Sequence, residues 1–189
     1  MAQLRFRMPS GIPFYPVRYI SHGLIVISVI IAILGFIFPM LISYFGLRAI
    51  PLSPETIPYI LWQIVFYQFL HWDALHILLN SYFLYQAGPE VESRMRRREF
   101  LIFFFANTLF VAVSLWFLSA GLTIGISGFC MALLSYLYMD LQATRHPLAN
   151  QILVMLVINI ALGLTGNISF VGHAAGAVFG MVWWMWKRR

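Results

Sequence analysis

Charged residues are scarce in this sequence. Asp, Glu, Lys and Arg make up only 10% of its 189 residues, whereas in soluble domains they average about a quarter. Hydrophobic residues contribute 61%, and the mean hydropathy is +0.84. A composition this far from that of soluble domains indicates an integral membrane protein, and the length leaves no room for a soluble domain beside the apolar segments.

Cysteine is nearly absent, and the common metal motifs are missing. Cys130 is the single cysteine, which excludes an internal disulfide, and no CxxC or Cys/His finger spacing occurs. The sequence also lacks a His-Glu-x-x-His motif and a pair of aspartates within apolar segments. We therefore expect no metal ion and no other cofactor.

Six apolar segments account for most of the chain. We expect membrane spans over residues 20–45, 71–87, 100–120, 126–142, 150–165 and 169–186. Residues 46–70 contain three prolines and then a stretch rich in Trp, Tyr and Phe, which is typical of a segment in the membrane interface. The sequence therefore predicts an all-α polytopic membrane protein, in which residues 1–189 form one domain of six transmembrane helices with a membrane-associated first loop.

Basic residues indicate the orientation of these spans. The net charge is +6, but the basic residues stand at the ends of apolar segments, which is a topology signal and does not indicate a nucleic-acid surface. With the N-terminus in the cytoplasm, the following residues lie on the cytoplasmic side: Arg5, Arg7, Arg18, Arg94, Arg96, Arg97, Arg98, Arg145, Lys187, Arg188 and Arg189. Only Arg48 then lies outside. We expect both termini in the cytoplasm, contact with the lipid bilayer, and no nucleic-acid partner.

Small residues form matching faces on two of the predicted spans. These faces are Gly172, Gly176 and Gly180 on the last span and Gly128, Ala132 and Ser135 on the fourth. If they pack together, the backbones approach closely enough for the Ser127 hydroxyl to reach His173. Small-residue packing alone can explain the glycines. A histidine inside an apolar segment is expensive, however, and is by default a sign of function.

A further pair of polar residues lies on the second predicted span. His76 and Asn80 are four residues apart, so their side chains face the same way on a helix. Both can donate hydrogen bonds, and donors that converge in a water-poor site can stabilise an oxyanion during acyl transfer. They can equally act as polar links between helices. A metal site built from His71, Asp73 and His76 matches no standard zinc spacing.

Three motifs in the same order resemble those of the rhomboid intramembrane serine proteases in their six-span bacterial form. The motifs are His76-x-x-x-Asn80, Gly125-x-Ser127-Gly128 and His173-x-x-Gly176-x-x-x-Gly180. The resemblance covers the chain from the end of the first predicted span to the C-terminus. Each motif alone is weak, but three of them on the expected spans and at compatible depths are specific.

The resemblance implies a role for each of these residues. Ser127 corresponds to the nucleophile that attacks the peptide bond, and His173 to its base. His76 and Asn80, together with the backbone at Gly125 and Ser127, correspond to the oxyanion hole. The implied activity is that of a serine endopeptidase that cleaves single-span membrane proteins near their outer ends, in the inner (plasma) membrane of a bacterium.

Other positions extend the resemblance or depart from it. Glu92 and Arg94 resemble the Glu-x-Arg motif that follows the second span in the family, and Trp62 resembles the tryptophan of a Trp-Arg pair in the first loop. The arginine of that pair is Gln63 here. The tyrosine that supports the histidine ring is replaced by Met131, which we expect to position the base less firmly.

The acidic residues are compatible with a catalytic dyad. They are Glu55, Asp73, Glu90, Glu92, Glu99 and Asp140. None is expected near Ser127 or His173, and a neutral His173 can accept the serine proton without a costly buried anion. Cys130 is three residues from Ser127, but a buried free cysteine usually acts as a small hydrophobic residue.

A second interpretation stays open. A catalytically weak or inactive rhomboid-like protein could bind membrane clients through the same surface. The presence of both Ser127 and His173 favours the protease. A transporter is disfavoured, because no pair of broken helices and no charged path crosses the middle of the spans.

Overall fold

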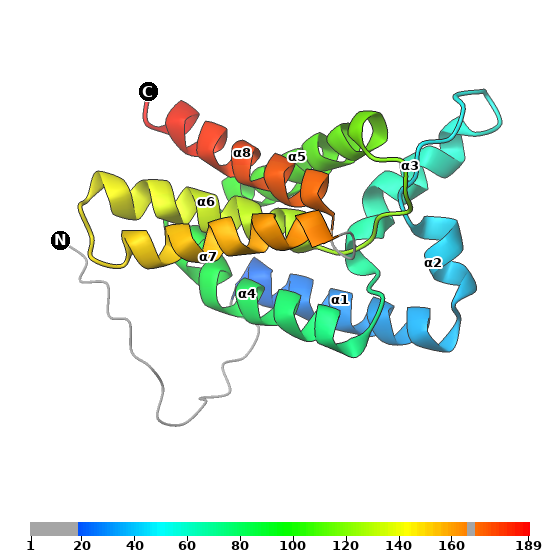
Figure 1. Ribbon diagram of the computed structural model, residues 1–189, viewed down its shortest axis with the longest axis horizontal. Coiled ribbons are helices and arrows are strands. Elements are labelled where there is room, and N and C mark those ends of the chain that lie inside the picture. Colours follow the sequence, from blue (N-terminus) through cyan, green and yellow to red (C-terminus); the bar gives the residue numbers. More distant parts are fainter. Residues whose placement is uncertain (1–18, 166–168) are drawn as a thin grey trace.

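A computed structural model of the chain describes residues 19–165 and 169–189, and these residues form a bundle of helices (Figure 1). The helices are α1 (Ile20–Ile37), α2 (Met40–Phe45), α3 (Ile57–Phe66), α4 (Ala74–Glu92), α5 (Arg97–Leu118), α6 (Ser127–Ala143), α7 (Ala149–Leu162) and α8 (Phe170–Lys187), with short 3-10 turns η1 (Tyr67–Phe69) and η2 (Gly163–Thr165). The described residues contain no β-sheet, only an isolated bridge between Leu47 and Thr123. The prediction of an all-α fold is confirmed.

Each predicted span contains a helix, but the helices differ in how well they suit a bilayer. Of the described helices, α1 and α5 are long and apolar enough to cross a membrane by length and composition. Helices α6 and α7 have only 17 and 14 residues. That α4, α6, α7 and α8 also cross the membrane stays a prediction. Arg5, Arg7 and Arg18, which support the predicted orientation, lie outside the described residues.

The predicted first span over residues 20–45 is divided in two, so the prediction of one continuous segment was wrong. Helix α1 ends at Ile37, Phe38 leaves the helical conformation with φ −122° and ψ 79°, and α2 begins at Met40. Pro39 is the cause, because a proline disfavours helical geometry in the residue before it and cannot donate a backbone hydrogen bond.

The second predicted span ends later than residue 87, because α4 continues through Pro89 to Glu92. The prediction treated the Gly-Pro pair as a stop, but contacts with α1 hold the last turn. A Cβ at Gly88 would overlap the Ser21 side chain. Glu92 accepts hydrogen bonds from the first two amides of α1 and from the Ser21 hydroxyl, at 2.9, 3.2 and 3.3 Å. This carboxylate therefore caps the start of α1.

Helix α6 lies at the centre of the bundle. Residues 128–137 are all buried, and α6 packs against α4, α5, α7 and α8. Figure 1 shows α8 lying along α5 and α6, the two helices against which it packs most extensively. The site described below is built at the N-terminal end of α6.

The predicted contact between the small faces of the fourth and sixth spans is confirmed. A Cβ added at Gly176 would overlap the backbone carbonyl of Gly128, and one added at Gly180 would overlap the Ala132 carbonyl and the Ser135 hydroxyl. Helices α6 and α8 thus touch backbone to backbone along two turns. No residue larger than glycine fits at either position of α8 without separating the helices.

Candidate active site

Ser127 is the first residue of α6 and follows a sharp turn. Gly125 has φ +113°, a left-handed conformation that favours glycine, and its amide donates to the Tyr67 carbonyl oxygen at 2.9 Å. This turn directs the start of α6 toward a cavity. Within the described part of the chain, the Ser127 hydroxyl makes no hydrogen bond, and the residue is partly exposed.

The cavity has a volume of about 870 Å³, and Ser127 and His76 both line it. Its other walls come from the start of α4, the connection between α5 and α6, and the start of α8. Asp73 also lines it, so one acidic residue shares the cavity with Ser127, although none was expected near Ser127 or His173. The Asp73 carboxylate already caps α4, where it accepts a hydrogen bond from the His76 amide at 2.8 Å.

His173 is buried on the first turns of α8, and one of its ring nitrogens is held. Nδ1 lies 2.8 Å from the backbone carbonyl oxygen of Asn159 on α7. A carbonyl oxygen can only accept, so Nδ1 carries a proton in this contact and the neutral ring leaves Nε2 as an acceptor. Nε2 is buried and has no hydrogen-bond partner among the described residues.

The contact between α6 and α8 aligns Ser127 with the turn of α8 that carries His173. A Cβ at Gly128 would lie 3.2 Å from the Gly172 carbonyl oxygen, and Gly176 lies directly against Gly128. Gly128 therefore packs against Gly172 and Gly176, which lie before and after His173 on α8. Ser127 directly precedes Gly128, so it lies beside the turn of α8 that carries His173. No hydrogen bond joins the two side chains in the described structure.

His76 and Asn80 converge on Gly125. A Cβ added to Gly125 would lie 2.8 Å from both Cε1 and Nε2 of His76, and 3.7 Å from Nδ2 of Asn80. Asn80 is buried, and its Nδ2 has no hydrogen-bond partner in the described ranges. Two side-chain nitrogens of α4 thus face the small space above Gly125, two residues before Ser127. This geometry can place two donors on one oxygen atom.

The remaining predicted residues lie elsewhere. Glu92 and Arg94 are at the opposite end of α4 from His76; Glu92 caps α1, and the Arg94 Nε lies 2.8 Å from Asp140 Oδ2. Trp62 is 56% exposed on α3. Gln63, the residue after it, is fully buried and donates weakly to the Tyr44 carbonyl at 3.4 Å. These residues support the fold and do not enter the cavity.

Met131 is buried in the main hydrophobic core. It is 1% exposed, so the position normally filled by a supporting tyrosine in the resembling family is here packed with a flexible thioether.

Sequence reasoning missed two groups near the site and considered a third, His71, only as part of a metal site. The Asn159 and Tyr67 carbonyl oxygens hold His173 and Gly125, and a backbone carbonyl gives no sequence signal. His71 is fully buried, its Nδ1 lies 3.1 Å from the Phe69 carbonyl oxygen, and its ring centre is 4.8 Å from that of His76. Among the described residues, no group of three His, Cys, Asp or Glu side chains is arranged to hold a metal ion.

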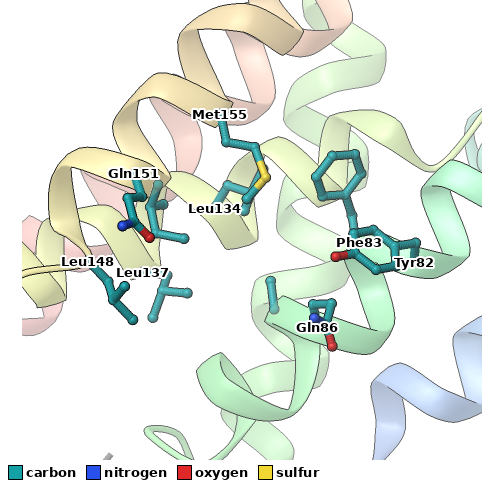
Figure 2. Close-up of a pocket in the computed structure, with 10 residues that line it drawn as sticks. Tyr82, Phe83, Gln86, Leu134, Leu137, Leu148, Gln151 and Met155 are labelled. Atoms are coloured by element: carbon teal, nitrogen blue, oxygen red, sulfur yellow. The ribbon is translucent and has the colours of Figure 1, made fainter. Parts of the chain in front are cut away.

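A second, smaller pocket of about 160 Å³ lies between α4, α6 and α7. Figure 2 shows Tyr82, Phe83 and Gln86 of α4, Leu134 and Leu137 of α6, and Leu148, Gln151 and Met155 at α7. Its lining is mostly apolar. It contains none of the candidate site residues, so the larger cavity at Ser127 is the candidate active site.

Comparison with known proteins gives an independent view of the chain. A rhomboid domain matches residues 59–189. The chain is 28% identical over 138 residues to the rhomboid protease GlpG of Serratia proteamaculans, an alignment that covers 68% of this chain and 49% of the relative. It is 26% identical over 138 residues to the rhomboid-like protease 3 of Toxoplasma gondii, which covers 68% of this chain and 52% of the relative. The chain thus spans about half the length of the curated relatives that it matches.

Proposed function

Since this chain belongs to the rhomboid family, we propose that it is an intramembrane serine endopeptidase that cleaves transmembrane segments of membrane proteins. One observation carries the proposal. Ser127 and His76 line one cavity, the α6–α8 contact places Ser127 beside the turn that carries His173, and Asn80 Nδ2 lies near Gly125, two residues before Ser127. A nucleophile, a base and two donors from three helices are thereby brought to the same end of the bundle.

In the proposed reaction, Ser127 and His173 act as a dyad. The Ser127 oxygen attacks the carbonyl carbon of the scissile peptide bond, and His173 Nε2 takes the hydroxyl proton. That proton then passes to the leaving amine as the peptide C–N bond breaks. Water attacks the resulting ester, again with His173 as base, and regenerates the serine. The Asn159 carbonyl keeps Nδ1 protonated, so Nε2 is the nitrogen that accepts.

The tetrahedral intermediate carries a negative oxygen, and the donors of α4 suit it. His76 Nε2 and Asn80 Nδ2 face the space above Gly125. The first amides of α6, including that of Ser127, lack acceptors within their own helix and lie at its positive end. Donors fixed in advance around a developing charge contribute much of the rate enhancement in acyl transfer.

The substrates in this proposal are single-span membrane proteins. With both termini in the cytoplasm, the Ser127 end of α6 lies near the outer surface of the membrane, which for this chain is the inner (plasma) membrane of a bacterium. Cleavage would therefore occur close to the outer end of the substrate helix. The abundance of exposed apolar side chains on α1 and α5 is consistent with contact with lipid.

A second candidate is a rhomboid-like protein of weak or absent activity that binds membrane clients. One observation favours it: the Ser127 hydroxyl and His173 Nε2 are not hydrogen bonded to each other within the described residues. Catalytic hydrogen bonds often form only when substrate is bound, so this geometry leaves the protease as the preferred proposal.

Covalent labelling with a fluorophosphonate separates the two candidates. The wild-type protein, purified in detergent, should be labelled and should cleave a transmembrane substrate, whereas Ser127→Ala should do neither. His173→Ala should lose cleavage because the serine has no base. Ser119→Ala is the matched control, since Ser119 lines the same cavity and should leave labelling unchanged. Equal cleavage by wild type and Ser127→Ala would refute the serine-protease proposal.

A further inference from the structure

Cys130 contacts the Asn80 side chain from the side opposite Gly125. Its Sγ lies 3.7 Å from the Asn80 backbone oxygen and 4.0 Å from the side-chain oxygen Oδ1. Both residues are buried, at 1% and 4% exposure. The other end of the same amide, Nδ2, lies near Gly125 and has no hydrogen-bond partner among the described residues. The amide therefore has a weak thiol contact at its oxygen and no described partner at its nitrogen.

The chemistry of a thiol decides which end of the amide faces it. A thiol is a weak hydrogen-bond donor and a still poorer acceptor, so it favours an oxygen over an NH₂ group as its neighbour. If the Asn80 amide were rotated by half a turn, its two N–H bonds would face sulfur and its oxygen would face the candidate oxyanion site. An oxygen there would repel the negative charge of the intermediate.

We propose that Cys130 is a positioning residue that fixes the Asn80 amide with Nδ2 directed at the oxyanion. This inference rests on the proposed function and deepens it. Cys130 lies one turn after Ser127 on α6, so the helix that carries the nucleophile also orients a donor on α4. The Ser127 hydroxyl and the Asn80 amide must both contact the carbonyl group of the substrate, and this arrangement fixes their relative positions. Small errors in such positioning lower the reaction rate strongly.

The contact itself can be measured without any activity. Cys130 is the only cysteine in the chain, so the S–H stretching band in the infrared spectrum of the whole protein reports on this thiol alone. Loss of a hydrogen-bond acceptor moves this band to higher wavenumber. Asn80→Ala removes Oδ1 and leaves the backbone oxygen at 3.7 Å as the remaining acceptor, so it should produce a small shift, while the control Asn107→Ala, another buried asparagine on α5, should produce none. An unchanged band in Asn80→Ala would overturn the proposal.

The role in catalysis is tested by a double-mutant cycle. Cys130→Ala should lower kcat by about two- to tenfold, the rate equivalent of one neutral hydrogen bond, with little change in KM. Cys130→Ser keeps a donor but adds a good acceptor, so it should restore kcat only in part. When Asn80 is already alanine, adding Cys130→Ala should cause no further loss, because the amide that it orients is gone.

The cycle distinguishes positioning from mere packing. Equal losses of kcat in the wild-type and Asn80→Ala backgrounds would assign Cys130 to packing alone and overturn the proposal, as would an unchanged kcat in Cys130→Ala. If the wild-type protein is labelled at Ser127 by a fluorophosphonate but the cycle shows no coupling, only the role of Cys130 fails. If Ser127 is not labelled at all, the proposed function fails and the positioning role fails with it.

Discussion

Polar side chains near the two ends of α6 differ in how completely they are hydrogen bonded. At the C-terminal end, Asp140 accepts hydrogen bonds from Arg94 at 2.8 Å, from Arg188 at 2.9 Å and from Trp184 at 3.3 Å. At the N-terminal end, Nε2 of His173 and Nδ2 of Asn80 are buried without partners among the described residues. At the first end one carboxylate links α6 to Trp184 of α8 and to the arginines that follow α4 and α8, whereas at the second end polar atoms of the described structure stay unpaired close to Ser127, which lines a cavity. We call these the saturated and the unsaturated end of α6.

This difference suggests that the two ends of α6 have different roles, one in stability and one in function. A buried polar atom without a partner costs about 1 to 3 kcal/mol, so a fold under selection for stability alone would pair such atoms. Unpartnered buried atoms also occur elsewhere in the described bundle, for example Ser28 Oγ and Trp183 Nε1. What distinguishes the N-terminal end of α6 is that Asn80 Nδ2 and His173 Nε2 lie on the helices that pack against α6, close to Ser127 at the edge of the cavity. We interpret the unsaturated end as the one reserved for a substrate.

The largest expected effect comes from Gly176, which holds α8 against the unsaturated end. Gly176→Ala places a Cβ on the Gly128 carbonyl, so α6 and α8 must separate and His173 moves away from Ser127. We expect loss of detectable cleavage together with a clear drop in thermal stability in detergent. Gly172→Ala is the milder control, because its Cβ would lie 3.2 Å from the Ser169 hydroxyl, which needs to move by only a few tenths of an ångström, and its nearest neighbours would all be side-chain atoms. Comparable stability of the two variants would contradict the backbone contact.

The next effect tests the open donors directly. His76→Ala and Asn80→Ala should each slow cleavage by roughly 10- to 1000-fold, because each removes one donor among several. The melting temperature should fall only slightly, since Asn80 Nδ2 has no protein partner to lose and Oδ1 loses only the weak Cys130 contact. Steady-state kinetics and thermal unfolding of the same preparations give both quantities. Unchanged kcat in both variants would assign these residues to helix packing.

A smaller and opposite effect is expected at the saturated end. Asp140→Ala leaves Arg94 and Arg188 without their shared carboxylate. Because these groups are partly exposed, we expect a loss of only about 1 to 2 kcal/mol of stability. The kcat of the folded enzyme should not change. Glu55→Gln removes one negative charge in the exposed first loop and serves as the control. A large fall in kcat for Asp140→Ala, at temperatures where the variant stays folded, would contradict the assignment of the saturated end to stability alone.

The parts of this architecture that follow from local patterns could be predicted from the sequence. Apolar runs gave the location of the six long helices, and the spacing of Gly176 and Gly180 indicated the face of α8 that meets α6. The pairing of Ser127 with His173 was inferred from that contact and stays a prediction. Pro39 carried enough information to predict the break after α1, but the apolar run on both sides concealed it.

The parts that depend on tertiary contacts could not be predicted. Helix α4 continues past Pro89 because Glu92 is needed to cap α1, a contact across more than seventy residues. The Asn159 carbonyl that holds His173 is a backbone group near the end of α7, where the last carbonyls of a helix lack intrahelical partners. Asp73 reaches the cavity only because the loop before α4 folds beside the start of α6. None of these leaves a signal in composition or spacing.

The smallest expected effect concerns the turn that follows the saturated end. Helix α6 closes with hydrogen bonds from the His146 amide to the Leu141 carbonyl at 2.9 Å and from the Arg145 amide to the Gln142 carbonyl at 3.1 Å, which together form a Schellman motif. Arg145 has φ 52° in this motif, a left-handed conformation that costs a residue with a Cβ about 1 kcal/mol. Arg145→Gly should therefore raise stability by about 0.5 to 1 kcal/mol, measured by thermal unfolding in detergent.

Thr144→Gly provides the control for that measurement, since Thr144 has φ −95° and gains nothing from glycine. Because the turn lies at the opposite end of α6 from Ser127, the kcat of Arg145→Gly should equal that of wild type. A change in kcat would show that the two ends of α6 are coupled, because relief of backbone strain at the saturated end would then alter the geometry at the unsaturated end. A lower melting temperature would mean that the Arg145 side chain contributes more to the fold than its backbone conformation costs.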